Sequence, residues 1–227
     1  MLAVATALDA KGLDLHQASA AIKQIKGSET IEIKNAANLH GLCAGLKEGE
    51  YDIIGDAGDY LGVLNDGATI RVTGNAGNYV GDNMTRGLIV VEGNAGHSAG
   101  VYPYGGTLLL RGNAGDFVAT MNKGATIIVC GNVGDEAATY HLAGDLIVVG
   151  DAGLNFGNFL IRGNLYLGGE FKSQGHNTRV EALTKDDAQK LNRLFEQFDV
   201  KADVARFRKM VAETAKPFYG RIVKRHE

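Results

Sequence analysis

The feature that most constrains the fold is a glycine motif that recurs at a fixed interval along the chain. Each copy has the form G-x-x-G and begins GDAG, GNAG or GNVG, at every nineteenth position: Gly55, Gly74, Gly93, Gly112, Gly131 and Gly150. A third glycine often follows four positions after the second glycine of the motif, whereas Ala119 and Ala138 take that place in two copies. A phosphate-binding glycine loop occurs once, between a strand and a helix, but a regular period indicates units that stack on their neighbours. GNAG is therefore predicted to be a structural corner.

Aligned repeats share two aliphatic columns that lie two positions apart. The first column contains Ile70, Ile89, Leu108, Ile127, Leu146 and Leu165, and the second contains Val72, Val91, Leu110, Val129, Val148 and Leu167. A spacing of two places both columns on one face of a strand. The residues between them face outward and are also largely apolar: Arg71, Val90, Leu109, Ile128, Ile147 and Tyr166. Because a large exposed apolar face usually packs against something, this column favours an assembly component.

The repeat length and the absence of a helical stretch within it predict an all-β core. We expect a single-stranded right-handed parallel β-helix of about seven 19-residue coils, spaced about 4.8 Å apart. The glycines are predicted to supply positive φ and close approach between coils. The column Asp56, Asn75, Asn94, Asn113, Asn132, Asp151 suggests a ladder of side-chain amides at a left-handed turn. Leucine-rich and hexapeptide solenoids do not fit this period or pattern.

Three parts of the chain are expected: an N-terminal segment over 1–29, a β-helix over 30–171 and a C-terminal helical extension over 172–227. A short helix is predicted over 17–26, and the glycines of the first coil, Gly41 and Gly45, are two positions out of phase with the later ones. Thr184 begins a capping-box pattern, followed by an apolar helical face and by a second amphipathic stretch around Phe207. These helices are expected to cap the open end of the rod. The basic tail over 216–227 is either solvated or in contact with a partner subunit.

Composition narrows the class of protein. The chain has 227 residues and a formal charge of −3, which is too small to indicate a nucleic-acid partner. Its two cysteines, Cys43 and Cys130, form no disulfide framework or zinc set, so we expect reduced thiols in a cytoplasmic protein. The N-terminus does not fit a signal peptide, and no apolar run is long enough to span a membrane.

Several polar residues allow alternative interpretations. Asp116 and Asp135 should lie one coil apart in a column that also holds His97. They could form a catalytic pair or a cation site, or they could be exposed turn residues. No catalytic, cofactor-binding or metal-binding residue is assigned.

Three smaller features also stand out when the repeats are aligned. His141 lies beside Asn122 in a column of its own. Glu92 and Arg111 should form an ion pair between coils. The segment Tyr102-Pro103-Tyr104 suits either a partner surface or a loop that covers the outer sheet.

The sixfold G-x-x-G-x-x-x-G repeat resembles the GXGXG domain of the glutamate synthase family. That domain is the last part of the glutamate synthase large subunit. It also occurs as a separate subunit, as in N-methylglutamate synthase, and in one of the subunits of formylmethanofuran dehydrogenase. The phrases DNMTRG from Asp82, GNAGHSAG from Gly93 and YGGTLLLRGNAG from Tyr104 are most similar to the stand-alone glutamate synthase-type subunits.

The resemblance implies a non-catalytic subunit that bridges an amidotransferase-like subunit and a subunit with FMN and an iron–sulfur cluster. It implies a hetero-oligomeric oxidoreductase complex of nitrogen metabolism, acting on glutamate with ammonia or methylamine, with no cofactor in this chain and no nucleic acid or membrane partner. One alternative is a formylmethanofuran-type complex. Alternatives from other classes are a stand-alone β-helix that binds carbohydrate or ice, and a trimeric acyltransferase-like β-helix with His97 between coils.

Overall fold

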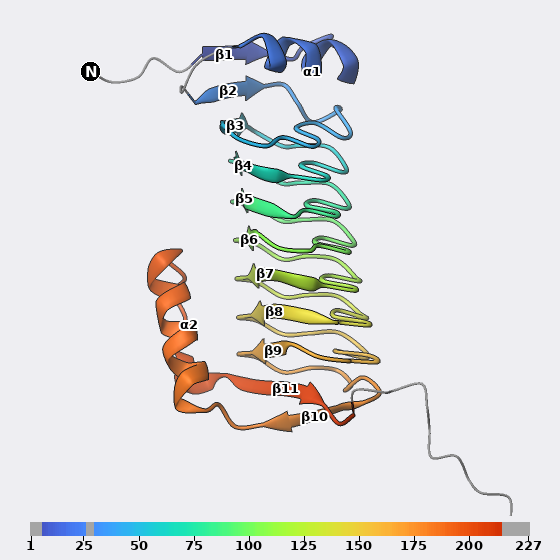
Figure 1. Cartoon of the computed structure of the whole chain (residues 1–227), viewed down its shortest axis with the longest axis vertical. Helices are drawn as coiled ribbons and strands as arrows, with labels where there is room; N and C mark the ends of the chain where they lie inside the picture. Colours follow the sequence, from blue (N-terminus) through green and yellow to red (C-terminus); the bar gives the residue numbers. More distant parts are fainter. Residues whose placement is uncertain (1–5, 26–29, 215–227) are drawn as a thin grey trace, which may run out of the picture.

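The strands of this protein form one sheet that runs the length of a rod. The computed structural model describes residues 6–25 and 30–214 and contains an 11-stranded sheet in the order β1-β2-β3-β4-β5-β6-β7-β8-β9-β11-β10. Figure 1 shows the strands stacked one above the next. The strands are β1 (Thr6–Asp9), β2 (Ile31–Lys34), β3 (Glu50–Ile54), β4 (Asp66–Val72), β5 (Arg86–Val91), β6 (Thr107–Leu110), β7 (Lys123–Val129), β8 (Ala143–Val148), β9 (Asn164–Leu167), β10 (Thr178–Glu181) and β11 (Arg208–Ala212).

The parallel register confirms the predicted β-solenoid of about seven turns. From β3 to β9 the paired residues are one repeat apart, as Ile70 is from Ile89 and Ile89 from Leu108, except at the first residues of β4 and β7, where the offset is one position longer. Both predicted inward columns are fully buried in one continuous core. Between β2 and β3 the offset is one position longer, because Ile31 pairs with Tyr51.

Each coil contains a segment in which every second residue has a left-handed backbone. In one coil these residues are Tyr79, Gly81 and Asn83, with φ of 61°, 69° and 56°. The first coil places Gly41, Cys43 and Gly45 at the three corresponding positions, also with positive φ. The glycines of the first coil are two positions out of phase, as noted from the sequence, because Cys43 occupies the position that Gly81 holds later. The backbone conformation of this segment nevertheless matches that of the later coils.

Of the two purposes predicted for the glycines, the first two glycines of most GNAG copies serve only close approach between coils. Gly96 has no positive φ, but a Cβ at this position would lie 2.4 Å from the Asn78 Oδ1 atom and 2.9 Å from the Asn78 backbone nitrogen. The same crowding by the preceding coil holds at Gly77 and Gly115. These glycines are required because neighbouring coils approach closely, whereas positive φ belongs mainly to the third glycine of the motif.

The asparagine column forms a ladder, but its bonds differ from the predicted amide-to-amide contacts. The Oδ1 atom of Asn94 accepts a hydrogen bond from the backbone N–H of Asn113 at 2.8 Å, and Asn113 does the same for Asn132. Each rung therefore joins a side-chain oxygen to the backbone of the next coil. Since only an oxygen is needed, aspartate can occupy the column, as Asp56 does at 2.7 Å from the Asn75 nitrogen.

The C-terminal helix is present but lies beside the sheet instead of over the end of the rod. Figure 1 shows α2 (Lys185–Gln197) running along the outer face of the later strands. Leu191 and Phe195 pack with the outward column in a second buried cluster that contains Val90, Leu109, Ile128, Ile147 and Tyr166. The chain thus covers its own apolar outer face, so this face does not by itself indicate a partner.

The predicted second amphipathic helix is also wrong. Val204–Arg206 form a single 3-10 turn, and the residues that follow form β11. β11 pairs antiparallel with β9 and then with β10, so two antiparallel strands protect the edge that the helices were expected to cap. The capping box itself is confirmed, because Thr184 and Asp187 bond reciprocally at the start of α2.

The other end of the rod is covered by the N-terminal segment. β1 pairs parallel with β2, and α1 (Leu15–Gln24) buries Ala18 and Ile22 in the main core. The predicted helix over 17–26 is therefore present and begins earlier, at an Asp14 capping box. The basic tail over 216–227 lies outside the described residues.

Replacing Gly96 by Val should lower the free energy of unfolding by about 3 kcal/mol, since an added side chain would force two coils apart. The control is Lys172→Ala at an exposed lysine, which should change stability by less than about 0.5 kcal/mol. Chemical denaturation measures both variants. Equal unfolding free energies for the two would show that close approach between coils is not what selects glycine here.

Candidate functional site

The most polar predicted column is a second ladder between coils. The Oδ1 atom of Asp116 accepts from the backbone N–H of Asp135 at 2.8 Å, and Asp135 accepts in turn from Leu154 at 2.8 Å. The two carboxylates lie one coil apart, as predicted, and line a groove of about 430 Å³ with Asp151 and Lys172. Among residues 6–25 and 30–214, no group of three or more His, Cys, Asp or Glu side chains could hold a metal ion. The arrangement supports a structural role for Asp116 and Asp135.

Histidines replace the carboxylate or amide at two positions of this second ladder. The Nδ1 atom of His97 accepts from the backbone N–H of Asp116 at 3.0 Å, and His40 does the same for Asp59 at 3.0 Å. An accepting Nδ1 requires the proton to be on Nε2, so each ring acts in the ladder as asparagine does elsewhere. His40 was not singled out from the sequence, although it lies one repeat length before Asp59 and could have been found by extending the column.

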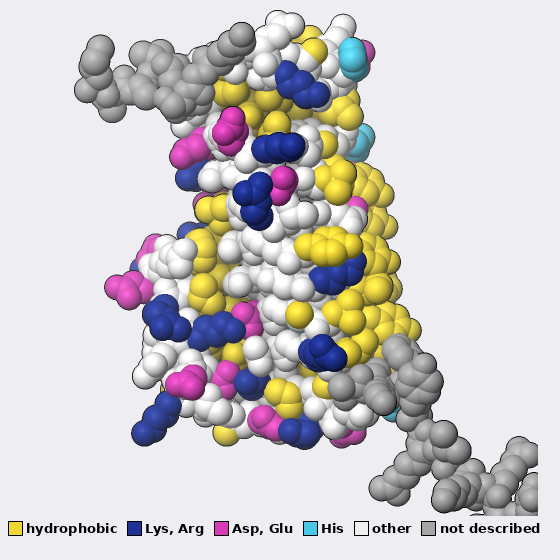
Figure 2. Space-filling model, in the orientation of Figure 1, with side chains coloured by type: hydrophobic (Ala, Val, Ile, Leu, Met, Phe, Trp, Pro, Cys, Tyr) yellow, Lys and Arg dark blue, Asp and Glu magenta, His cyan; other side chains and the backbone are white. Residues whose placement is uncertain are grey.

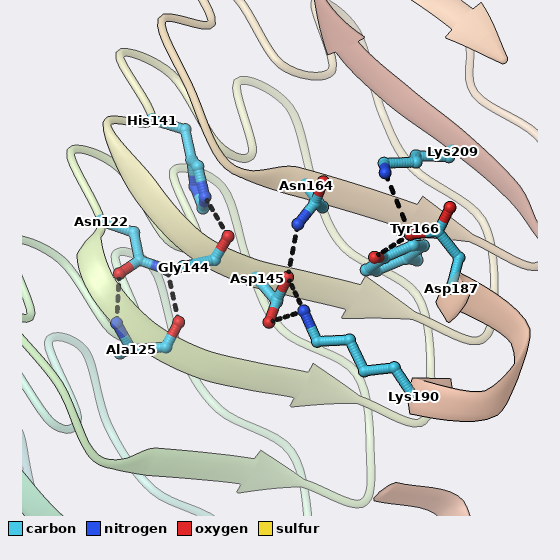
Figure 3. Close-up of polar contacts among 10 residues, drawn as sticks. All are labelled: Asn122, Ala125, His141, Gly144, Asp145, Asn164, Tyr166, Asp187, Lys190 and Lys209. Carbon is cyan, nitrogen blue, oxygen red and sulfur yellow. Dashed lines mark hydrogen bonds and ion pairs between the residues drawn. The ribbon is translucent and has the colours of Figure 1, made fainter. Parts of the chain in front are cut away.

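His141 is a buried member of a third column, which it shares with Asn122. The Asn122 side chain accepts from the backbone N–H of Ala125 at 2.8 Å and donates to its carbonyl oxygen at 2.9 Å. The Nε2 atom of His141 lies 3.3 Å from the Gly144 carbonyl oxygen (Figure 3). The Nδ1 atom of His141 is buried without a hydrogen-bond partner among the described residues. Burial lowers the pKa of His141 to about 4, so the ring is neutral at pH 7.

A group of charged side chains fastens α2 and β11 to the outer face of the sheet (Figure 3). Lys190 from α2 donates to Asp145 of β8 at 2.7 Å, and Asn164 of β9 donates to the same carboxylate at 3.0 Å. β9 also contributes the Tyr166 hydroxyl, which donates to Asp187 at 2.7 Å. The sequence gives little sign of these contacts, because α2 lies outside the repeat and its partners cannot be found by aligning columns.

Asp187 is the centre of the second half of this group. Besides Tyr166, it accepts hydrogen bonds from Lys209 at 2.9 Å and from Thr184. Burial acts to raise the pKa of Asp187, but the hydrogen bonds from Tyr166, Thr184 and Lys209 outweigh it and hold that pKa well below its usual range. Burial and the bond to Asp187 raise the pKa of the Tyr166 hydroxyl. Each charged group is paired with an opposite charge, which fits a structural clamp.

The remaining candidates have ordinary surroundings. Arg111 and Glu92 form the predicted ion pair, with 3.7 Å between Nε and Oε2. Cys43 and Cys130 are both free, and burial raises the pKa of both thiols, that of Cys43 to about 12. A raised thiol pKa means little thiolate at neutral pH and therefore low nucleophilicity.

Aromatic side chains gather on the corner of the rod opposite α2. Tyr102 and Tyr104 are 39% and 56% exposed, and the Lys123 ammonium lies 4.1 Å from the centre of the Tyr104 ring. Tyr60 and Tyr79 stack in adjacent coils with 4.6 Å between ring centres. Figure 2 shows hydrophobic side chains forming a band along this edge. Neither α2 nor the antiparallel end strands cover this band in the part of the chain that the structure describes.

Comparison with known proteins gives one family. The family model described as the GXGXG motif matches residues 17–220. No curated protein matches the chain. In the part of the chain that the structure describes, no helix has both the length and the apolar character needed to cross a membrane.

Replacing His141 by Asn should make the stability less sensitive to mild acid. The folded pKa of about 4 lies below the value of about 6.5 in an unfolded chain. The unfolded chain therefore binds a proton that the folded chain does not, and stability present above pH 6.5 is lost as the pH falls toward 4. The loss from this group is at most about 3 kcal/mol.

Asn122 shows that asparagine fits the equivalent position, so His141→Asn should fold normally. Urea unfolding at pH 7 and pH 4.5 measures the acid-induced loss of stability in both proteins. The loss should be smaller in the variant. Equal losses in wild type and variant would show that His141 is not the group responsible.

Proposed function

Because the chain belongs to the GXGXG motif family, we propose that it is a non-catalytic structural subunit of a glutamate synthase-like complex. In this proposal it bridges an amidotransferase-like subunit and a subunit that carries FMN and an iron–sulfur cluster. The complex makes glutamate or N-methylglutamate, and the family resemblance supplies the identity of both partners.

The observation that carries the proposal is how the polar side chains are used. His97, Asp116 and Asp135 accept backbone hydrogen bonds between coils, and Asp145 and Asp187 hold α2 against the sheet. A catalytic group must be free to contact substrate at a site where other groups converge. The residues singled out by the sequence instead hold the rod together, which supports a scaffold whose chemistry resides in other subunits.

The shape of the molecule supports a bridging role. The parallel strands from β1 to β9 stack in one direction, which gives a rod of roughly 40 Å at the usual strand spacing of about 4.8 Å. Successive coils are joined by backbone bonds and by two side-chain ladders, so the rod is a rigid spacer. A rigid spacer can hold two subunits at a fixed distance and orientation.

The acyltransferase-like alternative has lost its main candidate, because the His97 Nδ1 atom is already an acceptor in the second ladder. The formylmethanofuran-type alternative involves the same repeat domain and differs in its partners. The identity of the partners and cofactors therefore distinguishes the proposed function from this alternative.

The test is purification of the native complex through this chain, followed by mass spectrometry and an absorption spectrum. The proposal predicts an amidotransferase-like partner with flavin and iron–sulfur absorption. Partners that bind a pterin metal or a formyl carrier would favour the formylmethanofuran-type complex, and a colourless protein without partners would contradict both.

A variant of the purified complex tests the non-catalytic role directly. His97→Asn keeps the ladder acceptor, as Asn78 does in the preceding coil, but removes the imidazole. Turnover should be unchanged within about twofold. A hundredfold loss of turnover with normal assembly would show that His97 takes part in the reaction.

A further inference from the structure

The aromatic edge contains a short run of rings that is interrupted at one position. In the same column, Gly41 precedes this run and Glu136 follows it. One position in each coil holds Tyr60, Tyr79, Ser98 and Phe117 in four successive coils. All four residues have the same left-handed backbone, with φ between 56° and 63°. Three of the four side chains are aromatic rings at one corner of the rod. Ser98, the third of the four, has only a hydroxymethyl group in place of a ring.

The gap has the thickness of one stacked ring. Tyr60 and Tyr79 are nearly parallel, with 4° between planes and 4.6 Å between ring centres. Tyr79 and Phe117 are two coils apart, which corresponds to about 10 Å at the usual strand spacing. One planar ring between them would lie at stacking distance from both, within the range of centroid separations preferred by aromatic pairs.

The walls and floor of the gap form a pocket of about 320 Å³. It is lined by Tyr60, Tyr79, Asp82, Ser98, Val101, Tyr102, Phe117 and Thr120. The Thr120 hydroxyl is buried there and has no hydrogen-bond partner among the described residues. Asp82 supplies a carboxylate that accepts from Asn83 at 2.7 Å. The lining suits an uncharged planar ring with a polar group, and it contains no cation to receive a phosphate.

We infer that this gap, the Ser98 slot, receives one tyrosine or tryptophan side chain of a partner protein between the rings of Tyr79 and Phe117. The inference deepens the proposed function, on which it rests, by naming a contact through which the rod holds another subunit. An aromatic anchor in a pocket surrounded by exposed apolar side chains is the usual form of an interface hot spot.

The surroundings of the slot favour a polypeptide over a free small molecule. Tyr102 and Phe117 of the lining are 39% and 45% exposed. Leu64 and Leu154 lie outside the lining and are 56% and 45% exposed, and Leu154 is two coils beyond Phe117. A single ring would fill the slot but leave this band uncovered. A protein segment lying along the edge would cover the band and place its aromatic side chain in the slot.

The first test fills the slot from within. Ser98→Tyr should place a fourth ring between Tyr79 and Phe117, because position 98 already has the backbone that carries tyrosine at 60 and 79. The melting temperature should equal or exceed that of wild type. The control, Lys172→Tyr, adds the same ring at an exposed position outside the lining. A melting temperature well below wild type for Ser98→Tyr alone would show that the gap cannot hold a ring.

The second test uses a blocked tryptophan, N-acetyl-tryptophanamide, as the probe. The chain contains no tryptophan, so indole emission reports the probe alone. The full chain and Lys172→Tyr should shift the emission to shorter wavelength, whereas Ser98→Tyr should bind at least tenfold more weakly. Phe117→Ala, which removes one wall at an exposed residue, should also weaken binding. Equal binding by all four proteins would show that the probe does not bind in the Ser98 slot and would contradict the inference.

The purified complex separates this inference from the proposed function. The Ser98→Tyr chain should bind a partner subunit at least tenfold more weakly than the Lys172→Tyr chain. A flavin-containing complex that assembles equally with both would overturn the slot as a docking site and leave the proposed function standing. Probe binding at the slot without such a complex would contradict the proposed function, and a free aromatic molecule that co-purifies in the slot would overturn the assignment to a partner protein.

Discussion

The structure depends on hydrogen bonding between coils that stay in register from one repeat to the next. This constraint explains why the chain tolerates a costly backbone. Many non-glycine residues, such as Ala119 and Tyr79, have positive φ at 58° and 61°, a conformation that costs about 1 kcal/mol or more for an L-residue. Their backbone N–H groups bond to a neighbouring coil, so the stack determines a conformation that an isolated turn would not keep.

Much of the fold could be predicted from sequence because the repeat is local and periodic. The inward columns, the parallel stack and the capping box at Thr184 follow from spacing and residue type alone. The position of α2 did not follow, because it depends on Lys190 reaching Asp145 and on Tyr166 reaching Asp187, two contacts outside the repeat. The stretch around Phe207 was mistaken for a helix because β11 is formed by pairing with β9, which overrides a helical pattern of apolar residues.

The candidate site, like the fold, could be predicted from the sequence only in part. Alignment of the repeats placed His97, Asp116 and Asp135 in one column, but it did not show that each accepts a backbone N–H from the next coil. Because of those bonds, Asp116 and Asp135 are interpreted as structural residues that join coils and not as a catalytic pair. The Ser98 slot could not be recognised from the sequence either, because a serine between Tyr79 and Phe117 becomes a feature only when neighbouring rings of this column, Tyr60 and Tyr79, are known to stack. What distinguishes this rod is therefore a framework built from polar groups and an exposed edge built from aromatic ones.

The most direct test of the ladders compares Asn94→Asp and Asn94→Ala by chemical denaturation. The Asn94 side chain is one rung of the first ladder, and its oxygen receives the Asn113 backbone N–H at 2.8 Å. If the ladder needs only an acceptor oxygen, Asn94→Asp should stay close to wild type and Asn94→Ala should lose about 1 kcal/mol. Equal stability of the alanine and aspartate variants would contradict the claim that these polar columns exist to join the coils.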